Sequence, residues 1–206
     1  MNYLKSEQIK LTTPRCQFQY SWLVDPDTKF EPASWKVTAL IPAENSVDIE
    51  KALGELLESW KKQLKTSSPN KKFKLANMPF GFESINGEEY FSIRMKRKTG
   101  GVRQDGTRWE NSPPQLFDAN GKPITDKAPL SKLGPGTEGR ISFIASGYDN
   151  PSQGVGIKIQ VSAAQIIKKV DYAPGAQNYG FETEEGWTEE ASSTTEAVEA
   201  NDAGDF

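Results

Sequence analysis

The sequence predicts a mainly β protein, a small barrel or sandwich with one amphipathic helix inserted between strands. Several short segments alternate apolar and polar residues with period two, turn residues separate these segments, and one longer segment follows the helical period. The chain has 206 residues, 35% of them hydrophobic and 26% charged. That length is enough for one sizeable core, and the composition is polar but globular.

The first strands are expected before residue 42. Residues 16–24 alternate, and a second strand, 35–41, ends at Pro42. Residues 7–12 are a further, shorter candidate. The side chains expected to share one face of the first of these segments are Cys16, Phe18, Tyr20, Trp22 and Val24.

The one strong helix is expected over residues 46–65. Its apolar residues recur at the helical spacing from Ile49 to Leu64. Asn45 or Ser46 can cap the beginning, and acidic residues in the first turn face the positive end of the helix dipole.

Later strands are expected at 89–98, 115–118, 139–148 and 155–162. Gly100-Gly101 begins a loop that continues to Trp109, and Asn120-Gly121 is a turn signal typical of hairpins. Phe91, Ile93 and Met95 are expected to point into the core.

Charge is strongly divided along the chain. Residues 1–170 contain all 25 lysines and arginines and carry a net charge of +7, whereas residues 171–206 carry −10. From residue 182 onward almost nothing can be buried, so we expect a folded domain, 1–170, and a disordered acidic tail, 171–206. A basic body suits a polyanion, although a solvated body with a solubility tail would show the same division.

Several function classes are excluded or disfavoured. The chain has no histidine and one cysteine, Cys16, which excludes an internal disulfide, a Cys/His zinc site and a histidine-based triad. The longest apolar run is three residues, so we expect no transmembrane helix and no signal peptide. Glu88, Glu89, Asp105 and Lys96 could form a nuclease-like metal cluster, but adjacent strand positions face opposite ways. We therefore predict no catalytic residue, no metal and no cofactor.

Two basic segments with interleaved rings are candidates for binding single-stranded nucleic acid, which needs cations for phosphates and rings for unpaired bases. One is 90–109, and the other is 71–82. Each has an ordinary interpretation too: a solvent-facing basic strand for the first, and a loop whose phenylalanines close the barrel for the second. The predicted DNA-binding residues are Trp35, Lys36, Lys71, Lys72, Lys74, Tyr90, Arg94, Lys96, Lys98, Arg103, Arg108, Trp109 and Tyr148.

The C-terminus ends in an aromatic residue among acids. Asp202, Asp205 and Phe206 are predicted to dock on a partner, because the ring supplies an anchor and the charges steer it to a basic groove.

These features occur in the order of a known family. The segment from Trp35 to Pro42, the helix 46–65, Met78-Pro79-Phe80, the turn 118–122, the strand 155–170 and the terminal Gly204-Asp205-Phe206 are each short. Together with the basic body and acidic tail, they resemble the gene 2.5 type of single-stranded DNA-binding protein of T-seven-like podoviruses.

The resemblance implies a five-stranded OB-fold barrel that coats DNA single strands in phage replication, recombination and repair, in the cytoplasm of the infected bacterium. It also implies a homodimer whose tail contacts the phage DNA polymerase and primase-helicase. The chain differs from that pattern in a shorter tail and an arginine-containing loop at 99–109. The alternatives are a protein-interaction module with an acidic DNA-mimic tail and, less favoured, a metal-dependent nuclease.

Overall fold

The structure is a computed structural model that describes residues 4–103 and 105–172. The chain divides into two units, Met1–Tyr172 and Ala173–Phe206, and the second lies outside the described residues. The domain limits at 170 and 171 therefore stay a prediction. The same holds for the docking residues Asp202, Asp205 and Phe206.

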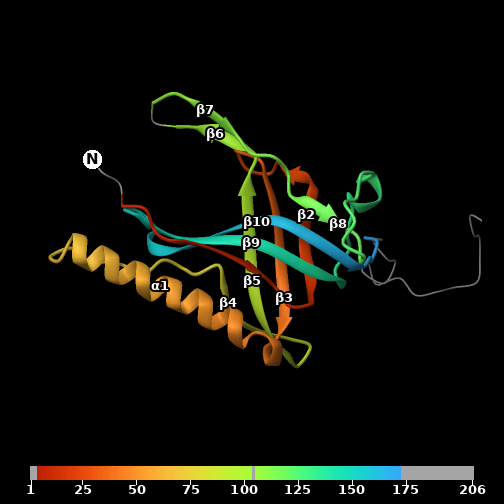
Figure 1. Ribbon diagram of the computed structural model, residues 1–206, viewed down its shortest axis with the longest axis horizontal. Coiled ribbons are helices and arrows are strands. Elements are labelled where there is room, and N and C mark those ends of the chain that lie inside the picture. Colours follow the sequence, from red (N-terminus) through yellow and green to blue (C-terminus); the bar gives the residue numbers. More distant parts are fainter. Residues whose placement is uncertain (1–3, 104, 173–206) are drawn as a thin grey trace, which may run out of the picture. The chain divides into compact units, whose positions relative to one another are not determined.

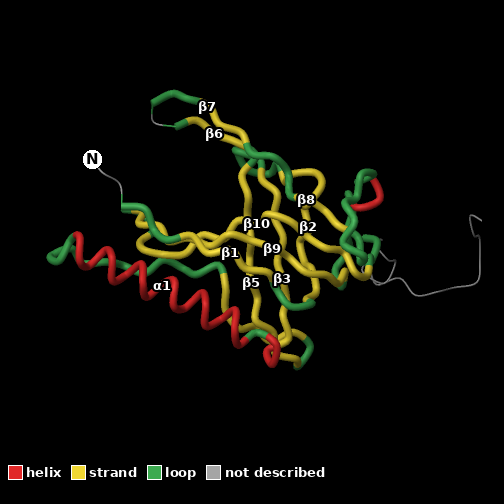
Figure 2. The backbone as a smooth tube through the Cα atoms, in the orientation of Figure 1, coloured by secondary structure: helices red, strands yellow, loops and turns green. Residues whose placement is uncertain are grey.

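The first unit consists of strands with one long helix between them (Figures 1 and 2). The strands are β1 (Gln8–Thr12), β2 (Cys16–Asp27), β3 (Ser34–Pro42), β4 (Phe80–Ile85), β5 (Glu88–Lys98), β6 (Gly100–Val102), β7 (Arg108–Glu110), β8 (Gln115–Phe117), β9 (Thr137–Asn150) and β10 (Gly154–Lys168). The helix is α1 (Val47–Ser67), and the 3₁₀ turns are η1 (Ala43–Asn45) and η2 (Ala128–Leu130).

The main sheet has the strand order β4-β5-β3-β2-β9-β10-β8, and β1 pairs with β9 beyond the end of β2. Its pairs are antiparallel except for β8 with β10. Leu75, before β4, bridges to Val155 of β10 and brings the two sides of the sheet together. The predicted OB-type barrel with one inserted helix is thus confirmed, but this sheet has eight strands within the described residues rather than five.

The core lies inside this curved sheet, and the period-two pattern identifies most of it correctly. Alternate residues of β3, β5, β9 and β10 are buried because successive strand side chains point to opposite faces. The buried inward-facing residues on these strands include Val37, Ala39, Ile41, Phe91, Ile93, Met95, Ile141, Phe143, Ala145, Ile157, Ile159 and Val161.

The helix α1 follows the predicted period, and its two halves pack in different places. Ile49, Leu53 and Leu56 join the main core, whereas Trp60 and Leu64 form a second cluster with Val155. The described residues contain no helix that is both long and apolar enough to cross a bilayer.

The sequence analysis predicts no strand at residues 80–85 and a loop from Gly100 to Trp109, and the structure differs at both places. Phe80–Ile85 is strand β4, and Asn86-Gly87 turns it into β5 with φ values of 54° and 84°. Residues 100–110 form a second hairpin of β6 and β7, the arm, which projects from one end of the barrel (Figure 1). The ring of Trp109 packs against Gly101, where an added Cβ would lie only 3.0 Å from the indole.

Candidate nucleic-acid interface

The outer face of β2, β3 and β5 carries polar and aromatic residues in rows that cross the strands. Residues directly opposite each other in an antiparallel pair point to the same side of the sheet, so the register defines these rows. One row contains Trp22, Lys36 and Lys96, and the next contains Gln19, Thr38 and Arg94. We call this surface the sheet face.

A β-bulge in β2 brings two aromatic rings to the sheet face. The pairing with β3 slips between Gln19 and Trp22, where two residues of β2 oppose one of β3. Tyr20 has a φ of 48° and is 75% exposed, while Trp22 is 43% exposed. Bulges of this kind re-aim side chains. The predicted shared face of this strand is therefore wrong at Tyr20 and Trp22, because the slip sends Leu23 into the core instead.

Lys36 is held beside Trp22. Its ammonium group pairs with the carboxylate of Asp27, which also accepts the backbone N–H of Lys29 at 3.0 Å. Hydrogen bonding from Lys36, with a smaller contribution from Lys29, lowers the pKa of Asp27. The ammonium lies 5.8 Å from the centroid of the Trp22 ring, within cation–π range. Part of the Lys36 charge is thus already matched, whereas Lys96 and Arg94 are exposed.

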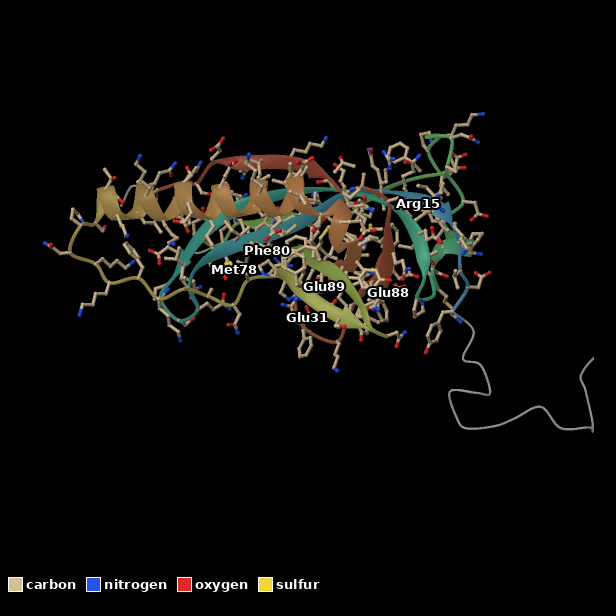
Figure 3. The ribbon with its side chains drawn as sticks, turned by 90° about the horizontal axis from the view of Figure 1, so that it is seen from below. Arg15, Glu31, Met78, Phe80, Glu88 and Glu89 are labelled. Atoms are coloured by element: carbon tan, nitrogen blue, oxygen red, sulfur yellow. The ribbon has the colours of Figure 1, made fainter. Side chains whose placement is uncertain are left out.

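A groove of about 320 Å³ is hollowed into the sheet face beside β4. Phe80 begins β4 and lines the groove, and Met78 lies just before that strand (Figure 3). The Arg94 guanidinium donates a hydrogen bond of 3.1 Å to the carbonyl of Met78. The lining residues are Gln19, Tyr20, Thr38, Phe80, Gly81, Phe82, Glu83, Ile85, Ser92 and Arg94.

The basic residues of β5 lead into the arm. Lys98 ends β5, and its carbonyl accepts the Asn111 side-chain amide at 2.9 Å, which ties the base of the arm to the strand. Arg103 and Arg108 are exposed on the arm, while Trp109 is half-buried. The structure thus brings together Lys36, Arg94, Lys96 and Lys98 and continues their line toward Arg103 and Arg108.

Two of the predicted stacking rings lie in the interior. Trp35 is 6% exposed, and its indole N–H donates to the carbonyl of Val24 at 3.2 Å. Tyr90 is 8% exposed beside Pro42, where η1 packs against β5, and its hydroxyl donates to Glu88. Neither ring is available to stack on a base, so we leave both out of the candidate interface.

The remaining predicted residues form a separate group at the end of α1, near the β9–β10 turn. Lys71 pairs with Asp149 at 2.6 Å, and the Lys74 carbonyl accepts the Val155 N–H at 2.8 Å. Lys72 is exposed and Tyr148 is half-buried. A groove of about 750 Å³ lies here, and Lys71 and Tyr148 line it. The sheet-face groove shares none of its lining.

The acidic residues considered for a nuclease-like metal cluster do not lie together. Glu88 and Glu89 begin β5 (Figure 3), whereas Asp105 lies in the arm beyond the other end of that strand. Asp105 accepts hydrogen bonds from the hydroxyl and N–H of Thr107, and these lower its pKa. Within residues 4–103 and 105–172, acidic and cysteine side chains form no group of three or more that could hold a metal ion.

Comparison with solved structures finds proteins of the same architecture. The gp2.5 single-stranded DNA-binding protein of bacteriophage T7 superposes with a TM-score of 0.62 at 19% identity, over 88% of this chain and 99% of that chain. The single-stranded DNA-binding protein of bacteriophage Enc34, in complex with single-stranded DNA, gives 0.55 at 14% identity, over 82% and 89%. This chain shares their fold. No protein-family model and no curated protein sequence matches it. The similarity to these proteins therefore lies in the fold alone.

Proposed function

We propose that this protein binds single-stranded DNA without catalysis and with little dependence on sequence. The observation that carries the proposal is the row of Trp22, Lys36 and Lys96 on the sheet face, next to the exposed ring of Tyr20. Two solved proteins of this fold are named as single-stranded DNA-binding proteins, which supports the same ligand here.

The two kinds of side chain have separate roles in the proposed mechanism. The rings of Tyr20 and Trp22 stack on unpaired bases, and every base has a face on which an aromatic ring can stack. Lys96 and Lys98 neutralise phosphates and release bound counterions. Stacking and counterion release do not require a particular base, so binding is largely independent of sequence.

The line of cations defines a path for single-stranded DNA across the protein. Because β5 leads into the arm, the bound DNA crosses the sheet face and continues past Lys98 toward Arg103 and Arg108. An OB-type module covers about 4–16 nucleotides, and the sheet face with the arm suits this range.

The wider role is proposed from the resemblance to the gene 2.5 type of protein and from the division of charge. We propose that the protein coats DNA during phage replication, recombination and repair in the host cytoplasm, and that it acts as a homodimer. We further propose that its acidic C-terminal segment contacts the phage DNA polymerase and primase-helicase and competes with DNA for the basic body. The division of charge, +7 against −10, supports this competition.

The test is a titration of the full chain with a fluorescently labelled oligo(dT), read by anisotropy and by tryptophan fluorescence at two salt concentrations. We expect binding that weakens with salt, together with tryptophan quenching. Trp22→Phe keeps a ring, so it should bind within a few-fold of the wild type but lose most of the quenching. Trp22→Ala should lose affinity as well, because stacking contributes about 1–3 kcal/mol per base.

Trp35→Phe is the matched control, because that ring is buried and should leave the quenching unchanged. The proposal is wrong if neither the full chain nor the chain lacking residues 182–206 shows binding at low salt. A protein-interaction module would give this result, whereas a nuclease would cleave the labelled strand when magnesium is added.

A further inference from the structure

The groove beside β4 has features that general stacking and phosphate contacts do not require. Its volume of about 320 Å³ is near the lower end of the range for small-ligand sites, about 300–1,000 Å³, which suits one flat group. Tyr20 lies at one side, and Gln19, Thr38 and Ser92 line it with an amide and two hydroxyls. We propose that this groove is a subsite that receives one nucleobase and reads its edge, an inference that rests on the proposed DNA binding.

The backbone beside the groove carries no side chain at Gly81. Gly81 of β4 lies opposite Ser92, and a Cβ added to Gly81 would meet no atom within 4 Å. The glycine therefore leaves open space at the wall of the groove. Its conformation does not explain the glycine, because its φ is not in the left-handed region. Open space against the backbone is what a flat ligand needs to approach a strand closely.

Arg94 sets which edge the subsite prefers. A guanidinium group is a donor only, with no acceptor atom. One of its nitrogens donates to the Met78 carbonyl, which fixes the side chain at the rim and leaves its other N–H groups for a ligand. Thymine and guanine present a carbonyl oxygen at the position where cytosine and adenine carry an amino group. A donor facing a carbonyl forms a hydrogen bond, whereas a donor facing an amino group does not.

The subsite therefore favours bases with that carbonyl, thymine and guanine, over cytosine and adenine. Gln19 and Thr38 stand in the same row as Arg94 and can both donate and accept, so they complete the contacts of either favoured base. The result is a modest base preference within otherwise sequence-tolerant binding.

The experiment compares oligo(dT) with oligo(dC) of equal length on the full chain at one salt concentration. Both bases are pyrimidines of nearly equal size, and a homopolymer offers the same base in every register. We expect a roughly tenfold preference for oligo(dT), the scale of one good edge contact. Arg94→Gln replaces a donor-only group with an amide that both donates and accepts, so the ratio of the two affinities should fall toward one even though both affinities drop with the lost charge.

Gly81→Val tests whether the open space at the wall of the groove is needed. The valine side chain would fill the groove, and a β-strand accepts valine. This variant should abolish the preference while the protein still binds. Ser84→Val adds the same side chain to the same strand away from the groove and should keep the wild-type ratio. Thermal melting of both variants confirms that they fold.

Each outcome has a distinct meaning. If neither the wild type nor the chain lacking residues 182–206 binds either oligonucleotide, the proposed function is wrong. If the wild type binds both equally, or if the preference survives in both Arg94→Gln and Gly81→Val, DNA binding stands and the base subsite is overturned. A preference that survives would come from the flexibility of the DNA backbone, which these substitutions do not alter.

Discussion

Tyr20 combines an exposed aromatic ring with a strained backbone conformation. A side chain with a φ of 48° lies in the left-handed region, which costs a non-glycine residue roughly 1–2 kcal/mol. The bulge in β2 keeps Tyr20 there and leaves its ring 75% exposed. The ring gains little from burial, so its position is better explained by a ligand that stacks on it.

We expect Tyr20→Gly to separate stability from binding. Glycine adopts this φ without strain but costs the unfolded chain more entropy, so the free energy of unfolding should change by less than about 1 kcal/mol. The affinity for oligo(dT) should fall by roughly 5- to 100-fold, as expected when one stacking ring is lost. Urea unfolding and fluorescence anisotropy measure the two quantities. A large loss of stability with unchanged affinity would assign Tyr20 a structural role.

Asp27 is expected to make the stability of the fold depend on pH in the acidic range. Its pKa lies below the usual 3.8, chiefly because of the hydrogen bond from Lys36. A carboxyl with a lowered folded-state pKa stabilises the fold above its unfolded pKa and loses that contribution as pH falls through the folded value. The melting temperature of the wild type should therefore drop more between neutral pH and about pH 3 than that of Asp27→Asn. Equal drops in the two proteins would contradict this assignment.

The sequence could not reveal the site residues on β2 by its pattern alone. Trp22-Leu23-Val24 are all apolar, so period two permits either Leu23 or its neighbours to face the core. Only the pairing of β2 with β3 determines which of these residues face the core. Tyr90 fails for a related reason: its position in β5 is on the outer side as predicted, but a 3₁₀ turn from elsewhere in the chain covers it.

At the scale of elements, the sequence predicts the helix and most strands, including the short strands β1 and β8, but not β4, β6 and β7. The helix and the strands β2, β3, β5 and β9 lie within a few residues of their predicted limits because their apolar faces repeat several times, whereas β10 continues six residues beyond its predicted end at 162. Strand β4 was missed because Gly81 weakens its strand pattern. Asn86-Gly87 was a readable hairpin signal for it.

The basic residues of β5 should act together as phosphate contacts. Lys96→Gln with Lys98→Gln should make the salt dependence of oligo(dT) affinity shallower by about 0.7 per lost contact in the log–log slope. Lys71→Gln with Lys72→Gln removes the same charge from the group near α1 and serves as the control. If the second pair reduces the slope more than the first, the main path of the strand lies near α1 and not on the sheet face.

At the scale of the whole chain, charge division gives the last prediction. Residues 171–206 carry −10 and are tethered to a body of +7, so we expect them to compete with DNA phosphates at a high effective concentration. Deleting residues 182–206 should raise the affinity for oligo(dT), most strongly at low salt, because added salt screens the competitor as well.

Deleting Phe206 alone removes a ring without changing net charge, since the terminal carboxylate moves to Asp205. That variant should bind DNA only modestly more tightly but should capture the phage polymerase much less in a pull-down. An unchanged DNA affinity after the longer deletion would rule out charge competition, and polymerase capture that does not depend on Phe206 would rule out docking through the ring.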